Sequence, residues 1–346
     1  MNFDLMKTLG IKKNVPKVDF TEYSGLIRGQ SKIGKTKLAS LLPNSVLVAF
    51  EQGYDAHVIN YIDCFTNGWE AFVEFIDSLE DNREAVGEQL KLIIIDTAEE
   101  AYSSCESYML RKESSRDGIK YSKIGDIPHG RGYSDKDEYF KKQIKRLYAL
   151  GFKITYLTHT EIKTVRPKDK RQEPYDIIKS TMPARQENIV MPEVSYIMNI
   201  ERAVINGKAT RVLKISGEDE SSETGSRFYF SDDIPFESEE EAVSKFQEKF
   251  KEVIKNRLEK DGIKKSIEEL SVEQNEEKMK EVLGNIETAK IENIKSEIEA
   301  LKKELKGDDK IKVIAKLKEN NCFVEKIDTE TDVKKLTKML EMMKSK

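Results

Sequence analysis

Short apolar runs alternate with amphipathic stretches over the first two thirds of the chain, a pattern typical of strands that alternate with helices. Leu92 to Ile95 is continuously apolar, as expected of a parallel strand covered on both faces. Trp69–Leu79 and Asp137–Leu150 instead repeat apolar residues at helical spacing. The predicted strands are Ser24–Arg28, Ser45–Phe50, Lys91–Asp96, Lys153–Thr158, Tyr196–Arg202 and Ala209–Ser216. After an N-terminal segment, residues 1–20, we therefore expect an α/β core with a mostly parallel sheet over residues 21–235.

Two stretches interrupt this rhythm. Glu113–Ser134 and Glu161–Asn188 are polar, and the second contains three prolines. We expect both to be long loops, which in compact domains are usually functional or disordered.

The pattern changes from Phe236 onward. Residues 236–306 predict a helical extension that starts with an amphipathic helix over Glu239–Lys260. Ile286, Ile291, Ile294, Ile298 and Leu301 form a coiled-coil-like stripe, which either joins two chains, folds back on the preceding helix or belongs to a single exposed helix. Residues 307–346 predict a small helical module with helices at Ile311–Glu319 and Asp332–Lys344.

Composition limits the class of protein. The 346 residues are 38% hydrophobic and 35% charged, which indicates solvated helix outside the packed core. The net charge of −4 excludes a globally basic nucleic-acid binder, although not a local basic groove. Three dispersed cysteines argue against a disulfide framework or a zinc site. The sequence has neither a signal-peptide pattern nor an apolar run of membrane-spanning length, so we expect a cytoplasmic protein without a membrane partner.

The stretch GQSKIGKT matches the G-x-x-x-x-G-K-[ST] spacing of a phosphate-binding loop. It lies between a predicted strand and a predicted helix, as such a loop requires. Its backbone N–H groups are expected to surround phosphate oxygens, with Lys35 at the β- and γ-phosphates and Thr36 on Mg²⁺. The predicted ATP-binding residues are Gly29, Gln30, Ser31, Lys32, Ile33, Gly34, Lys35 and Thr36.

Acidic residues stand at two further strand ends. Asp96 ends the strand KLIIID and is the expected Walker B aspartate on the Mg²⁺ side, although it is also placed to cap the following helix. Glu51 follows the strand VLVAF and is the candidate base that polarises the attacking water. Glu99 and Glu100 are rivals for that role, and Glu51 is otherwise an ordinary surface residue.

His159 ends the predicted strand KITYLT. Parallel sheets bind ligands at the carboxyl ends of their strands, so His159 is a candidate sensor of the γ-phosphate. The alternative is a purely structural histidine.

Together GQSKIGKT, FEQG, IIIDT, GRGYSDKDEYFKKQIKRLYALGFKITYLTHT and ETGSRFYF resemble the phage RecA-like ATPases of the Sak type, over about residues 20–235. The resemblance implies a RecA-like P-loop ATPase that hydrolyses ATP with Mg²⁺ and binds single-stranded DNA. It also implies a role in annealing or strand exchange, with Lys35, Thr36, Glu51, Asp96 and His159 in the roles given above.

In RecA-type proteins two mobile loops hold DNA, and the two polar stretches lie where those loops belong. Their cations can neutralise phosphates and their aromatic side chains can stack on bases, although both stretches also contain acids. The candidates are Arg116, Lys120, Tyr121, Lys123, His129, Arg131 and Tyr133 in the first stretch, and Lys163, Arg166, Lys168, Lys170, Arg171, Tyr175, Lys179 and Arg185 in the second.

Filament-forming ATPases complete their site with a cation from a neighbouring subunit. Arg227 is the first candidate and Lys214 the second, although Arg227 is also placed to pair with Asp232 or Asp233 of its own chain. We therefore expect a homo-oligomer or filament. The C-terminal module is a candidate dock for a single-strand-binding protein.

Three other functions fit parts of this pattern. They are another oligomeric P-loop motor or helicase loader, a nucleotide-gated scaffold that acts through its helical tail, and, less well, a small-molecule kinase.

Overall fold

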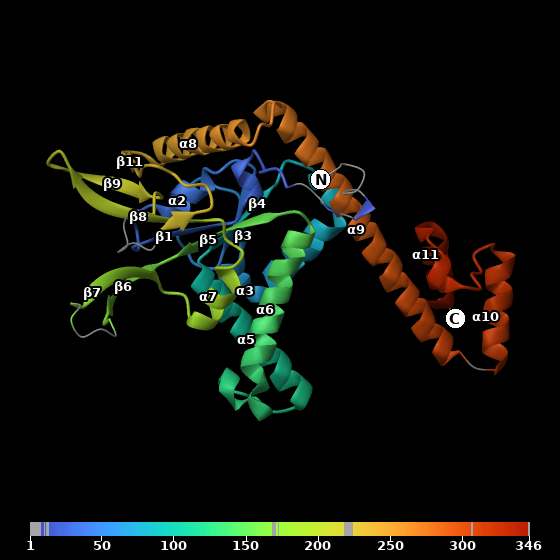
Figure 1. Cartoon of the computed structure of the whole chain (residues 1–346). Coiled ribbons are helices and arrows are strands. Elements are labelled where there is room, and N and C mark those ends of the chain that lie inside the picture. Colours follow the sequence, from blue (N-terminus) through green and yellow to red (C-terminus); the bar gives the residue numbers. More distant parts are fainter. Residues whose placement is uncertain are drawn as a thin grey trace. The chain divides into compact units, whose positions relative to one another are not determined.

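The computed structural model describes residues 8–9, 11, 14–167, 171, 173–217, 224–305 and 307–344 (Figure 1). The chain divides into two compact units, Met1–Glu276 and Glu277–Lys346. Each unit is described separately below.

The first unit is built on a sheet that has nine strands in the described part of the chain. Neighbouring strands run parallel from one edge inward in the order β3 (Tyr61–Asp63), β2 (Ser45–Ala49), β4 (Leu92–Asp96), β5 (Lys153–Thr158), β1 (Gly25–Gly29) and β8 (Tyr196–Ile205). The antiparallel strands β9 (Lys208–Lys214), β10 (Gly225–Ser226) and β11 (Ile234–Phe236) extend the sheet beyond β8. The predicted α/β class with a mostly parallel sheet is confirmed.

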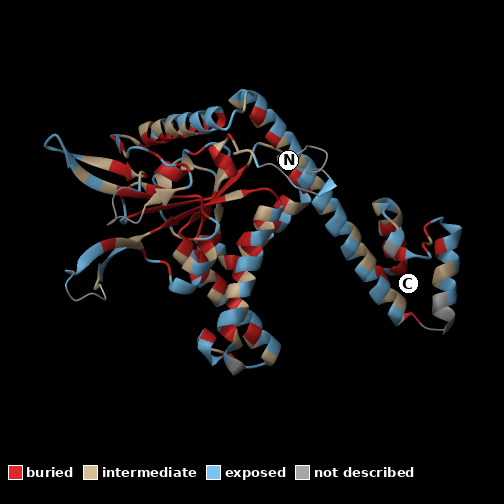
Figure 2. Ribbon diagram, in the orientation of Figure 1, coloured by how far each residue is buried: buried red, intermediate tan, exposed pale blue. Residues whose placement is uncertain are grey.

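Helices cover both faces of this sheet, which is why its central strands are buried throughout (Figure 2). One face carries α3 (Cys64–Asp81), α5 (Ala98–Asp117) and α6 (Arg131–Ala149), and the short helices α4 (Arg83–Val86) and α7 (Ala184–Val190) accompany them. The other carries α2 (Lys35–Ser40) and α8 (Glu239–Lys260). In β4, Ile93 to Ile95 are at most 1% exposed, as the continuous apolar run predicts.

The first unit continues past the boundary that composition placed after residue 235. Phe246, Phe250 and Ile254 of α8 lie in the same core as β1 and β8. Gln274, near the start of α9 (Ile267–Glu304), bonds to the N–H of Val18 and to the carbonyl of Pro16. The high Lys and Glu content reflects the outer face of α8, whereas its inner face completes the core.

The two stretches predicted to be long loops contain regular structure. In the first, α5 continues to Asp117, the 3₁₀ turns η2 (Ile124–Asp126) and η3 (Pro128–Gly130) follow, and α6 begins at Arg131. Arg131 pairs with Asp117 at 2.9 Å, so ion pairs between sequence-distant residues hold this helical tip. In the second, β6 (Thr160–Val165) and β7 (Tyr175–Ser180) form an antiparallel hairpin, and α7 follows. The prediction of irregular loops was wrong in both places.

The second unit is a small helical module. The end of α9 packs with α10 (Gly307–Glu319) and α11 (Val333–Lys344) around Ile298, Leu317 and Leu336, and the turn η5 (Ile327–Thr329) lies between the last two helices. Ile291, Ile294 and Leu301 pack against the same core. Four of the five stripe residues, all but Ile286, therefore pack in a core formed with the helices that follow α9. Among the described helices, none has both the length and the apolar character needed to cross a bilayer.

Candidate active site

The phosphate-binding loop connects two buried elements. β1 lies in the middle of the sheet between β5 and β8, and α2 starts at Lys35, six residues after β1 ends at Gly29. Gly34 adopts φ of +106°, a left-handed conformation that residues with a Cβ rarely adopt. The glycine of the motif therefore sets the shape of the loop just before the helix.

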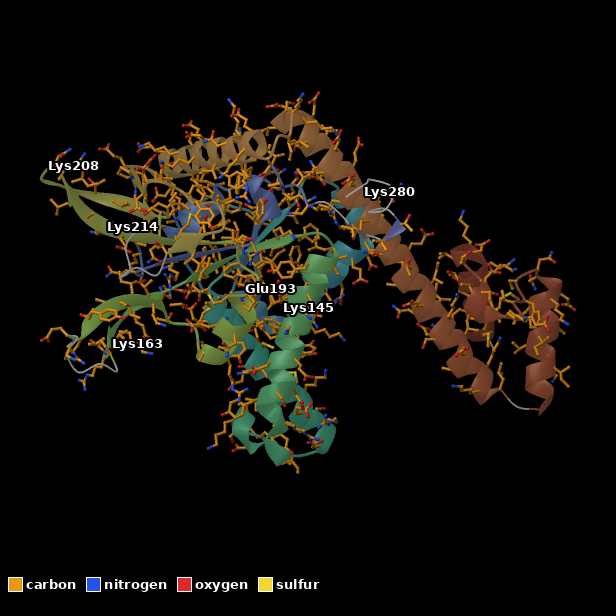
Figure 3. The ribbon with its side chains drawn as sticks, viewed as in Figure 1. Lys145, Lys163, Glu193, Lys208, Lys214 and Lys280 are labelled. Carbon is orange, nitrogen blue, oxygen red and sulfur yellow. The ribbon has the colours of Figure 1, made fainter. Side chains whose placement is uncertain are left out.

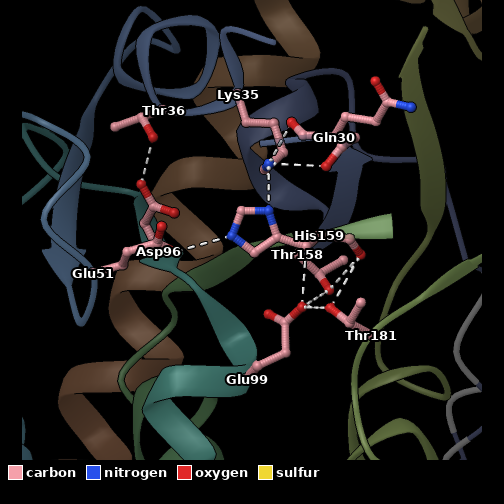
Figure 4. A network of polar contacts seen from close by, with 10 residues as sticks. Gln30, Lys35, Thr36, Glu51, Asp96, Glu99, Thr158, His159 and Thr181 are labelled. Carbon is pink, nitrogen blue, oxygen red and sulfur yellow. Dashed lines mark hydrogen bonds and ion pairs between the residues drawn. The ribbon is translucent and has the colours of Figure 1, made fainter. Parts of the chain in front are cut away.

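Lys35 points into the loop that precedes it (Figure 4). Its Nζ donates to the carbonyls of Gly29 at 2.9 Å and Gln30 at 3.1 Å, and lies 3.2 Å from Nδ1 of His159. Burial lowers the pKa of Lys35, while the negative charges of Asp96 and Glu51 act in the opposite direction. The ammonium group is thus fixed at the centre of the predicted phosphate site.

Thr36 and Asp96 meet on the other side of the loop, where the Thr36 hydroxyl donates to Oδ2 of Asp96 at 2.6 Å. A Cβ added at Gly53 would lie 3.3 Å from Thr36 Oγ1, so the backbone after β2 also approaches this pair closely. Burial raises the pKa of Asp96 to about 6, although its bond from Thr36 works against that rise. A buried carboxylate of this kind favours a nearby cation.

The donor set fits Mg²⁺ held jointly with a nucleotide. Within the described residues, no group of three or more His, Cys, Asp or Glu side chains is arranged to hold a metal. Mg²⁺ bound with a nucleotide takes one or two protein oxygens and completes its shell with phosphates and water. Thr36 Oγ1 and Asp96 would supply those oxygens. Thr97 Oγ1 lies beside them in the cavity, buried and without a hydrogen-bond partner in the described structure.

His159 joins Lys35 to Glu51. Its Nε2 lies 3.1 Å from Oε2 of Glu51, and its Nδ1 faces the Lys35 ammonium, which can only donate. Nδ1 therefore accepts, which places the imidazole proton on Nε2, where it is donated to Glu51. The ends of β1, β2 and β5 thus converge on one set of polar contacts, as the sequence predicted.

The rival acids of α5 take other roles. Glu99 Oε1 accepts from the N–H of His159 at 2.9 Å and from the hydroxyls of Thr158 and Thr181. Glu100 is exposed on the helix surface and does not line the cavity. Of these three candidate acids, Glu51 is the one that lines the cavity.

Lys35, Thr36, Glu51, Asp96 and His159 line a cavity of about 500 Å³, and its lining also includes residues that the sequence did not indicate. Arg211 of β9 donates to the carbonyl of Ile33 at 3.3 Å and to the Glu239 carboxylate at the start of α8. Lys37 lies 3.5 Å from the second oxygen of Glu239. No local motif marks these residues, because the contacts join the loop to elements more than 170 positions away.

Arg227 lies elsewhere. It follows β10, which pairs with the first residues of β8 and so lies at the amino ends of the parallel strands, opposite the loop. Its guanidinium donates to the carbonyl of Pro192 at 3.4 Å. Asp233 instead pairs with Lys214, and Asp232 pairs with Lys249. Neither predicted trans cation reaches the cavity of its own chain.

Comparison with solved structures gives distant likenesses. The KaiC-like protein of Pyrococcus horikoshii OT3 is 12% identical, with 66% of this chain and 89% of that chain covered and a TM-score of 0.31. The flagellar accessory protein FlaH of Methanocaldococcus jannaschii is 13% identical, with 61% and 82% covered and a TM-score of 0.30. Scores this low carry no argument about activity. No curated protein sequence matches the chain.

A family model gives the assignment. The model described as an AAA domain matches residues 21–228, which include the loop, Glu51, Asp96 and His159. This range ends before α8 and covers more than half of the chain. With the phosphate-binding loop at the centre of a mostly parallel sheet, the chain belongs to the AAA-domain family of nucleotide-binding P-loop ATPases.

Proposed function

We propose that the protein is an ATPase stimulated by single-stranded DNA, and that it uses this activity in phage recombination to promote annealing or strand exchange. The observation that carries the proposal is the contact chain from Lys35 through His159 to Glu51, whose histidine is joined directly to a basic hairpin. The recombination role rests on the sequence resemblance to the Sak-type ATPases.

The site residues suit ATP hydrolysis. Lys35 and the loop N–H groups bind and orient the phosphates. Thr36 and Asp96 would hold Mg²⁺, which when bound would neutralise the charge that develops on the phosphate oxygens. Glu51 Oε2 accepts from His159 and its side chain is 41% exposed toward the cavity. It is therefore placed to accept a proton from the attacking water. His159 positions this carboxylate relative to Lys35.

The same histidine is joined to the β6–β7 hairpin. β6 begins one residue after His159, and the N–H of Thr181, just after β7, donates to the His159 carbonyl at 3.1 Å. Thr158 and Ser180 are in hydrogen-bond contact at 2.9 Å, and Glu99 accepts from both Thr158 and Thr181. Both strands of the hairpin are thus fixed at the end of β5, so a shift of His159 on phosphate binding reaches them directly.

The hairpin itself suits a nucleic-acid strand. Lys163 projects from β6 (Figure 3), and Arg166, just after β6, is exposed. Ile162 and Tyr175 are exposed large apolar side chains. Cations that neutralise phosphates next to an aromatic ring are the usual elements of single-strand binding. Lys168 and Lys170, also predicted to take part, lie outside the described residues.

The helical tip after α5 is a weaker candidate surface. Arg116 and Arg131 pair with Asp117, and Lys123 pairs with Asp126 at 4.0 Å. Cations already matched by acids gain less from binding phosphate. We therefore assign the DNA contact to the hairpin.

Assembly completes the proposal. Because Arg227 lies at the edge opposite its own cavity, it acts on phosphate only if a neighbouring subunit brings its cavity to that edge. The protein then works as a homo-oligomer or filament in the host cytoplasm. The second unit, which lies outside the match to the family model, is the proposed dock for a single-strand-binding protein.

The test measures DNA binding and ATP turnover together. Labelled single-stranded DNA is titrated with wild type and with a Lys163→Glu, Arg166→Glu variant in the presence of ATP and Mg²⁺. Lys145→Glu, on the exposed face of α6, is the matched control (Figure 3). We expect affinity and DNA stimulation to fall in the hairpin variant alone. Equal affinity in all three proteins would refute the assignment of the DNA surface.

A further inference from the structure

Arg211 and Glu239 form an ion pair directly on the phosphate-binding loop. They come from β9 and from the first residue of α8, and neither belongs to the motifs of the site. Besides bonding to Ile33 and Glu239, the Arg211 guanidinium donates to the carbonyl of Glu237 at 2.9 Å and stacks over Phe236 at 4.8 Å. These contacts hold a partly exposed cation at the mouth of the cavity, since its side chain is 25% exposed.

The Glu239 carboxylate touches the loop itself. A Cβ added at Gly34 would lie 2.5 Å from Glu239 Oε1 and 2.9 Å from Arg211 Nη1. The side chain of Glu239 is only 11% exposed, and it lies between Arg211 and Lys37. A carboxylate therefore lies against the part of the molecule that is built to receive an anion.

This placement is unfavourable for nucleotide binding unless the carboxylate has a specific role. Phosphate oxygens that enter the loop meet a negative charge at Gly34, and like charges at short range in a partly buried site repel strongly. The same carboxylate pairs with Arg211 and, together with Glu240 at 3.0 Å, with Lys37, and both cations line the cavity. An incoming phosphate has the charge and the oxygen acceptors to replace Glu239 on a guanidinium.

We propose that Arg211 is a nucleotide-binding residue supplied by the same chain, and that Glu239 is its internal counter-ion, which competes with the nucleotide phosphates for it. Nucleotide binding moves the guanidinium from the carboxylate to a phosphate oxygen. The inference rests on the proposed nucleotide-binding activity and adds to it a second cation beside Lys35. Because Glu239 starts α8, the exchange also makes the first turn of α8 sensitive to nucleotide.

The two partners of the pair are predicted to have opposite effects on affinity. Arg211→Gln is expected to weaken ATP binding about tenfold, the loss of one charge-assisted hydrogen bond. Glu239→Gln is expected to strengthen ATP binding severalfold, because the competing charge is gone while the side chain keeps its size. In the Arg211→Gln background, the Glu239→Gln substitution is expected to increase ATP affinity by a smaller factor. A pair that only holds the fold together predicts that both single variants weaken binding.

The experiment measures equilibrium binding of a fluorescent ATP analogue, with Mg²⁺, to the full chain. Lys208→Gln is the matched control, since Lys208 lies on the same strand and pairs with exposed Glu237 outside the cavity. The fluorescence of Trp69, the chain's one tryptophan, which is fully buried, verifies that each variant is folded. Lys35→Ala reports whether binding occurs at the loop.

The outcomes separate this inference from the proposed function. Weaker binding by Arg211→Gln with tighter binding by Glu239→Gln supports the inference. Binding that needs Lys35 but is unchanged in both variants, or weakened in both, overturns it and leaves the ATPase proposal intact. A wild type that binds no nucleotide overturns both.

Discussion

Asp96 is buried as a carboxylate, so replacing it with asparagine should stabilise the nucleotide-free protein. The side chain is 3% exposed and burial raises its pKa from 3.8 to about 6. The rise corresponds to ~3 kcal/mol of destabilisation at neutral pH, as an upper limit. An asparagine side chain at this position would keep an oxygen that accepts from Thr36 without the buried charge. We expect Asp96→Asn to gain about 1 to 3 kcal/mol in the free energy of unfolding at pH 7.5.

The pH dependence of this gain follows from the sign of the shift. Because the folded protein holds the Asp96 proton more tightly than the unfolded chain, the wild type loses stability as pH rises from about 4 to about 6. The gain of Asp96→Asn is therefore full above pH 6, declines below it and vanishes near pH 4. Urea unfolding followed by Trp69 fluorescence at pH 7.5, 5.5 and 4 measures it within the first unit.

Asp233→Asn is the control of opposite sign. Burial raises the pKa of Asp233, but bonds from the N–H groups of Ile215 and Ser216 and the ion pair with Lys214 hold the pKa below its ordinary value. That variant should lose stability at pH 7.5 and approach the wild type as pH falls through the lowered pKa.

An Asp96→Asn variant that is no more stable than wild type at pH 7.5, or whose gain in stability persists at pH 4, would refute the reasoning.

Three further predictions concern activity. Glu51→Gln is expected to lower ATP turnover by about 10²-fold or more while ATP still binds, because it removes the base and leaves the loop intact. Quench-flow turnover, measured beside binding of an ATP analogue, tests this, and unchanged turnover would mean that another acid is the base. Thr181→Val is expected to keep basal ATP turnover within about twofold yet reduce the stimulation of turnover by DNA, since it removes one hydrogen bond between Glu99 and the end of the hairpin. Stimulation equal to that of the wild type would contradict the proposed coupling between the hairpin and the nucleotide site. DNA affinity is expected to fall steeply between about 50 and 200 mM salt, with a smaller salt slope in Lys163→Glu; a slope near zero would exclude phosphate contacts.

The sequence predicted the central sheet, and the strand ends at which the candidate site residues lie, because both are local in the chain. Strands such as β4 are continuous apolar runs, and each predicted acid or histidine stands at a strand end. Parallel strands around β1 then bring Glu51, Asp96 and His159 to one edge without further information.

The parts that the sequence missed depend on contacts between distant residues. β6 is mostly exposed on both faces, and β7 has its buried residues at irregular spacing, so neither strand shows the period-two alternation that marks a half-buried strand. The tip between α5 and α6 is polar because ion pairs such as Arg131 with Asp117 hold it. Arg211 and Glu239 reach the loop through the fold of β9 and α8, and nothing near them in the sequence indicates a phosphate site.

The central claim is that nucleotide turnover at this loop responds to single-stranded DNA. The most direct measurement is steady-state ATP hydrolysis with Mg²⁺, with and without single-stranded DNA, for wild type and Lys35→Ala. We predict turnover that DNA stimulates in the wild type and that is lost in Lys35→Ala with or without DNA. Turnover that DNA leaves unchanged, or that survives in Lys35→Ala, would contradict the account.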